Sequence, residues 1–156
     1  MKSESEEWIY VEHLTAEHRR LDQLIHQTLA RLSDWEQNEL SNWPAELLTG
    51  LVSIRDELAR HFQEEEAGGC LEEAASLCSG LSNEVTAIEA EHAKLLSELD
   101  ELIDRARQLT RPAAREAHAL GQELRALAHA VRLHEARENQ IMQRGFGVGL
   151  ESDDAA

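Results

Sequence analysis

Four stretches of the chain carry apolar residues three and four positions apart, and short segments rich in Ser, Asn, Gly or Pro separate them. This spacing places the apolar side chains along one face of an α-helix. A helix with one apolar face must bury it against another element, and four such helices can bury their faces against one another. The sequence therefore predicts an all-α protein, an up-and-down four-helix bundle with short connections.

The breaks in the pattern set the expected ends of the first two helices. The first helix ends near Ser33, where the segment SDWEQNELSNWP interrupts the apolar spacing. The second helix begins after Asn42 and continues to about Glu66, before two glycines. We expect the following segment, CLEEAASLCSG, to be a short helical connection.

The last two helices are bounded in the same way. Ser82 or Asn83 is expected to cap the third helix, because short polar side chains accept hydrogen bonds from free N–H groups at helix starts. The third helix ends near Thr110, and the fourth follows Pro112 and stops at the glycines of the segment RGFGVGL.

A chain of 156 residues fits one domain of ordinary size. We expect an N-terminal extension over residues 1–9, the bundle over 10–143 and a flexible C-terminal tail over 144–156. No targeting peptide or membrane span is predicted, so the expected location is the cytoplasm. Cys70 and Cys78 are too few and too far apart for a disulfide scaffold or a CxxC motif, and we expect free thiols.

The charge balance excludes two classes of partner. Asp and Glu number 31 against 15 Lys and Arg, which gives a net charge of −16. Such a chain would repel both a phosphate backbone and an anionic bilayer, so nucleic acid and membrane are not expected partners. The composition leaves the oligomeric state open.

Histidine and glutamate residues interrupt the apolar faces at matching places. His61 and Glu65, like His134 and Glu138, are four residues apart and therefore point the same way one helical turn apart. Each of these histidines also continues the apolar spacing of its own helix. Both pairs are therefore predicted to point into the core.

Two single histidines stand on the other two helices. His18 lies between Leu14 and Leu21, and His92 stands in the same relation to Ile88 and Leu95. The chain has a weak internal repeat that aligns His18 with His92, and His61 and Glu65 with His134 and Glu138. Four helices are thus predicted to bring six polar side chains together: His18, His61, Glu65, His92, His134 and Glu138.

Two carboxylates and four imidazoles are costly to bury in an apolar bundle unless a cation compensates their charge. A mixed set of nitrogen and oxygen donors suits iron or manganese better than metals that prefer thiolate. Opposed helices of a bundle are also a common frame for such sites. The pattern therefore predicts two iron ions, with manganese as the alternative metal. A metal-free cluster in which the same residues bond one another is the competing interpretation.

The motifs that carry this pattern resemble the hemerythrin-like, or HHE cation-binding, domain over roughly residues 10 to 142. They are EH at 17–18, HFQEEE from His61, EH at 91–92 and HEARE from His134. The resemblance implies an up-and-down four-helix bundle with a non-haem di-iron centre held by the six residues named above. Oxygen-carrying hemerythrins have a fifth histidine on the third helix, and here Ile88 and Leu96 occupy its possible positions. Oxygen transport is therefore not implied.

Three functions remain compatible with this pattern. The favoured one is binding or sensing of O2, NO or another small ligand at the di-iron centre. The alternatives are iron handling or repair of iron centres under nitrosative or oxidative stress, and a di-iron oxidase or peroxidase. We find no nucleophile triad and no phosphate-binding loop, so whether the chain is an enzyme stays open.

Several residues near the six have other expected roles. His13 and His129 lie five residues from a predicted ligand, about 140° around the helix, and are expected on the surface with His26 and His118. Glu17 and Glu91 are expected to be surface charges, and Asp22 to accept a hydrogen bond from His18. Glu64 is the alternative to Glu65, and an ExxH motif formed by Glu89 and His92 gives a weaker, ferritin-like alternative.

Overall fold

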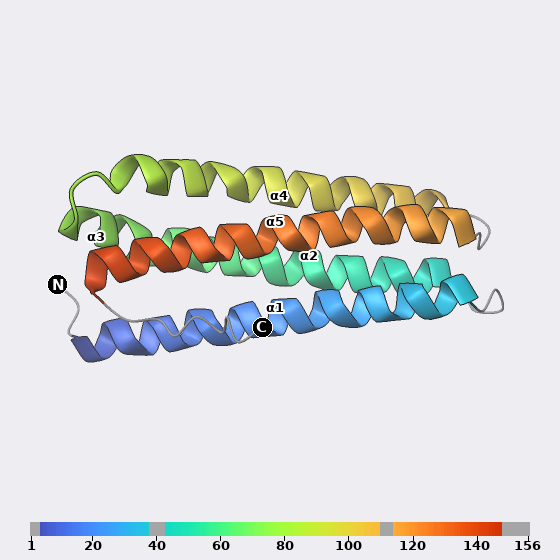
Figure 1. Ribbon diagram of the computed structural model, residues 1–156, viewed down its shortest axis with the longest axis horizontal. Coiled ribbons are helices and arrows are strands. Elements are labelled where there is room, and N and C mark those ends of the chain that lie inside the picture. The colour runs from blue at the N-terminus through green and yellow to red at the C-terminus, as the bar shows by residue number, and fades with distance from the viewer. Residues whose placement is uncertain (1–3, 38–42, 110–113, 148–156) are drawn as a thin grey trace.

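The computed structural model describes residues 4–37, 43–109 and 114–147, which form five α-helices and no strand. The fold class predicted from the sequence, all-α, is confirmed. In chain order the helices are α1 (Glu4–Gln37), α2 (Trp43–Gly68), α3 (Cys70–Leu77), α4 (Ser82–Gln108) and α5 (Ala114–Phe146). The long helices lie side by side, and the short α3 lies at the end of the molecule where α2 finishes and α4 begins (Figure 1).

The predicted second helix and the short helical connection are confirmed as α2 and α3, and the first helix is longer than predicted. Helix α1 continues to Gln37, one turn beyond Ser33. The reason is Trp35, which lies three residues after Leu32 and is buried in the same core. At its other end α1 begins at Glu4, so residues 4–9 are helical.

The start of α4 does not depend on a polar cap. The residue before the helix is Leu81, and no side chain there bonds a free N–H group, so the predicted capping role of Ser82 or Asn83 was wrong. Leu81 has no exposed surface and packs with Leu71 and Val85 in one apolar cluster. Burial of Leu81 therefore fixes where this helix begins.

Helix α5 runs past the first glycine that was expected to stop it. A Cβ atom on Gly145 would lie 2.5 Å from the Cβ of Ala74, so Gly145 allows α5 to approach α3 closely. Gly147 ends the helix instead, in a left-handed conformation with φ 66°. Its N–H group donates to the carbonyl oxygen of Gln143 at 2.9 Å. Residues 148–156, where a flexible tail is predicted, lie outside the described residues.

The buried apolar residues form two clusters along the bundle axis. One contains Leu21, Leu58, Leu95 and Val131 among others, and the other, beside α3, includes Leu14. Cys70 is buried and Cys78 is half-buried, and neither forms a disulfide among the described residues, as predicted. Within the described ranges, no helix is long and apolar enough to cross a membrane.

Candidate metal centre

The structure brings together all six residues singled out in the sequence. Each is buried, with at most 8% of its surface exposed. They come from the four long helices: His18 from α1, His61 and Glu65 from α2, His92 from α4, and His134 and Glu138 from α5.

The six side chains form a polar layer between the two apolar clusters. On α1, His18 lies between Leu14 of one cluster and Leu21 of the other. On α4, His92 lies between Ile88 and Leu95 in the same way. The helical spacing of three to four residues that buries these apolar side chains also turns the histidines inward.

The four histidines meet in two pairs across the bundle. The Nε2 atoms of His18 and His61 are 3.0 Å apart, and those of His92 and His134 are 3.1 Å apart. Each pair joins two helices that follow one another in the chain, α1 with α2 and α4 with α5. Two binding positions follow from this pairing.

Each of the two carboxylates faces both histidine pairs. For Glu65, Oε1 is 2.5 Å from Nε2 of His61, and Oε2 is 3.2 Å from Nε2 of His92. For Glu138, Oε2 is 3.6 Å from Nε2 of His18, and Oε1 contacts Nε2 of His134. In each resulting group, one ligand atom from each of four residues lies within 4.8 Å of the others. Glu65 and Glu138 belong to both groups.

The nitrogen and oxygen atoms of the six side chains are better placed to bind metal ions than to form hydrogen bonds with one another. The oxygens of Glu65 and Glu138 are buried, and none accepts a well-formed hydrogen bond among the described residues, despite the nearby Nε2 atoms. Buried carboxylate oxygens without partners are costly. Around an ion with bonds of about 2.1 Å, ligand atoms at right angles lie about 3 Å apart. The two Nε2–Nε2 distances match this spacing.

Three further glutamates hold the histidine rings from outside. Nδ1 of His61 donates to Glu17 at 2.5 Å, and Nδ1 of His134 donates to Glu91 at 3.0 Å. Glu17 is 3% exposed and Glu91 is half-buried, so the prediction that they are surface charges was wrong. Both precede an inward histidine and lie where α1 meets α2 and where α4 meets α5.

On α2, Glu66 plays the same part for His92, whose Nδ1 donates to Oε1 at 2.9 Å. An ionised carboxylate only accepts hydrogen bonds, so the proton of each of these three imidazoles is on Nδ1. In the neutral ring, Nε2 then carries a lone pair and faces the cluster. This is the tautomer that a metal-binding histidine needs.

The buried carboxylates strongly favour positive charge on the rings. Burial lowers the pKa of His61, but Glu65, Glu17 and Glu138 outweigh it and raise that pKa to about 9. Burial and carboxylates act in the same opposed way on His92, whose pKa is raised to about 10, and on His134. Burial raises the pKa of Glu138, but the neighbouring imidazoles hold it well below its ordinary value. Protons or metal ions can supply this positive charge.

The two halves of the site differ in the residue that follows the histidine of each HxxxE pair. Phe62 stacks on His92 with a centroid distance of 4.0 Å and an interplanar angle of 9°. Its counterpart in the internal repeat is Glu135, which is 8% exposed and has an Oε1 atom without a hydrogen-bond partner among the described residues. Burial and nearby acids raise the pKa of Glu135 to about 7. The sequence analysis did not predict either residue as part of the site, because their types differ between the two halves.

Other predicted neighbours fall outside the cluster. Glu64 is half-buried and accepts hydrogen bonds from His13 and Arg60, so Glu65 is the residue that faces the histidines. Glu17, Glu64 and the exposed His13 form a third group of possible ligands, but Arg60 already pairs with both carboxylates. His13, His26, His118 and His129 are exposed, as predicted.

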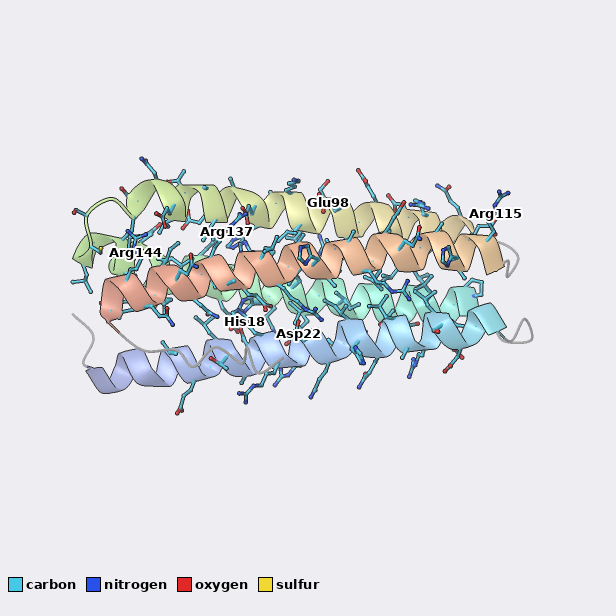
Figure 2. The ribbon with its side chains drawn as sticks, viewed as in Figure 1. His18, Asp22, Glu98, Arg115, Arg137 and Arg144 are labelled. Carbon is cyan, nitrogen blue, oxygen red and sulfur yellow. The ribbon has the colours of Figure 1, made fainter. Side chains whose placement is uncertain are left out.

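The prediction that Asp22 accepts a hydrogen bond from His18 was wrong. Asp22 is half-buried, and the hydrogen bonds found for the described residues do not include one from His18 to Asp22. Figure 2 shows both side chains projecting from α1 toward the other helices.

Comparison with known proteins agrees with the geometry. The sequence profile of the hemerythrin HHE cation-binding domain matches residues 10–144, which is most of the chain. Searches of curated proteins and of solved structures gave no significant match. The buried histidine and glutamate groups lie inside the matched region and have donors able to hold metal ions. The chain belongs to the hemerythrin HHE cation-binding domain family.

Proposed function

We propose that this chain holds two iron ions in the polar layer and binds a small diatomic ligand, O2 or NO, at that centre. The observation that carries the proposal is the pair of two-histidine, two-glutamate groups that share Glu65 and Glu138. His18 and His61 would hold one ion, and His92 and His134 the other. The four long helices would form the up-and-down bundle of the family, with α3 as a connection, and the expected location is the cytoplasm.

Iron is the metal that this donor set favours. Each position offers two imidazole nitrogens and two carboxylate oxygens, and no cysteine lies in either group. Such mixed sets are typical of non-haem iron, and manganese is the alternative. Four protein donors also leave a six-coordinate ion short of ligands. Ferrous ions held in this way would supply electron-rich positions to which O2 or NO can bind.

The protein surroundings favour binding of an apolar gas over access of water. Ile88, Leu127 and Val131, which lie on the same faces of α4 and α5 as the site, are at most 4% exposed. Phe62 covers the rings of His92 and His134, with centroid distances of 4.0 and 5.2 Å. These residues exclude water, which would otherwise compete for open positions.

Reversible ligand binding tests this proposal. Protein loaded with Fe²⁺ under anaerobic conditions is expected to change its visible and near-ultraviolet absorption when NO or O2 is added, and to recover when the gas is removed. The control is Glu101→Gln, which replaces an exposed glutamate on α4 and should give the same absorption changes as the parent protein. Sustained consumption of O2 or peroxide would contradict a binding role and favour an oxidase. Transfer of iron to an apo-protein without any gas response would favour iron handling.

The outer glutamates provide a second test. Replacing Glu17 with glutamine removes the charge that holds His61 by its Nδ1 proton. We expect the affinity for Fe²⁺ to fall by about 10- to 100-fold, as is typical for partners of metal-binding histidines. Competition with a chromophoric chelator measures this affinity. His13→Ala, which removes a neighbour of the same glutamate on the exposed side, should change it little; equal losses in both variants would refute the role of Glu17.

A further inference from the structure

The two histidine pairs would be equivalent if only the six proposed ligands were considered. Each pair has two Nε2 atoms about 3 Å apart and faces one oxygen of each shared carboxylate. The internal repeat also relates the halves, since His18 aligns with His92 and His61 with His134. Any difference between the two positions must therefore come from residues around them.

The repeat shows where that difference lies. Phe62 follows His61 on α2 and stacks on His92, whereas the residue that follows His134 on α5 is Glu135. In the same comparison Asp22, one turn after His18, aligns with Leu96, one turn after His92. One half of the site is thus bordered by a phenylalanine and a leucine, and the other by two acids.

Glu135 is a buried acid with one oxygen that lacks a hydrogen-bond partner among the described residues. Only 8% of its surface is exposed, and the oxygen without a partner is Oε1. Phe62 stacks on His92, so the repeat places its counterpart Glu135 beside His18. Burial raises the pKa of this carboxyl group, whereas the charges of His18 and His61 lower it. An isolated buried carboxylate is expensive to keep unless positive charge lies nearby. The six ligands alone do not explain why an acid occupies this position.

We propose that Glu135 lies beside the metal position between His18 and His61 and adds a carboxylate charge outside its four ligand residues, making that position the tighter of the two. This inference rests on the proposed function, because it requires ions at both positions. An extra negative charge in a buried site attracts a dication strongly, whereas the face of Phe62 adds no charge to the other position. Ions should therefore bind in two distinguishable steps.

Anaerobic calorimetric titration with Fe²⁺ alone tests this inference. The parent protein should bind two ions per chain in two steps whose affinities differ by at least about tenfold. In Glu135→Gln, which keeps the size of the side chain, the tighter step should weaken by about tenfold or more while the stoichiometry stays at two. Glu101→Gln, an exposed glutamate on α4, should leave both steps unchanged.

A spectroscopic readout separates this role from a merely structural one. Mössbauer spectra of the iron-loaded parent should contain two unequal signals, which should become more alike in Glu135→Gln but not in Phe62→Leu. Two equal steps in the parent, or a Glu135→Gln variant that titrates like the parent, would overturn the inference and leave the di-iron proposal intact. A parent protein that binds no iron would overturn both.

Discussion

Replacing Glu138 with alanine is expected to lower the number of iron ions held per chain from two to one or none. The side chain is 1% exposed, and its two oxygens face different histidine pairs. The substitution removes a donor from both positions and leaves the buried histidines without one of their two shared carboxylates. Iron content after anaerobic loading and desalting measures the effect.

Glu65→Ala should have the same consequence, since Glu65 also lies in both groups. Two controls match these substitutions. Glu64→Ala removes the carboxylate next in sequence, which faces His13 and Arg60, and His13→Ala removes an exposed imidazole. Both controls should still bind two ions. Retention of two ions by Glu138→Ala, or equal losses in all four variants, would contradict the assignment.

The metal-free protein should lose stability as the pH rises. The folded-state pKa of His61 is about 9 and that of His92 about 10, against an ordinary value of 6.5. A raised histidine pKa means that the folded state holds the proton more tightly than the unfolded chain. The stabilisation is therefore complete below about pH 6.5 and disappears as the pH rises through 9 to 10. For His61 alone it is on the order of 3 kcal/mol.

Urea denaturation of chelator-treated protein at several pH values measures this loss. Glu135 acts in the same direction, because its raised pKa of about 7 favours the protonated folded state at lower pH. Bound metal replaces the protons, so the iron-loaded protein should show a much flatter dependence. His129→Gln, which removes an exposed imidazole on α5, should leave the slope unchanged. A metal-free protein as stable at pH 10 as at pH 6.5 would refute the electrostatic account.

The helices and the six inward residues could be predicted because they obey one rule. His18, His61, His92 and His134 continue the apolar spacing of their helices, and the same spacing decides which face is buried. The predicted positions of Glu65 and Glu138 follow from the distance of one helical turn. The structure places these six predicted residues in one buried layer.

The outer glutamates escaped this rule because they lie at the edge of the apolar face. Periodicity places Glu17 and Glu91 beside the buried stripe, and only the packing of a neighbouring helix against that edge buries Glu17. A usable signal was nevertheless present in the sequence. The dipeptide Glu-His occurs at equivalent positions of the internal repeat, at residues 17–18 and 91–92.

Tertiary packing accounts for the other differences. Local preference predicts a polar cap at the start of α4, but the residue there is the buried Leu81. Helix α5 includes Gly145 because α3 lies too close at this point for a side chain. The burial of Glu135 likewise depends on what surrounds it and follows from no periodic pattern. Each of these features requires knowledge of which helices touch, which a single sequence does not supply.

The most direct test of the whole account is the metal content of the parent protein. Purified chain, stripped with a chelator and reloaded with Fe²⁺ in the absence of oxygen, should retain two iron ions per chain after desalting. Iron and protein are measured on the same sample by elemental analysis and amino-acid analysis. Two ions per chain would support a shared centre built by the six buried residues. A value of zero would contradict it, and a value of one would contradict the paired arrangement.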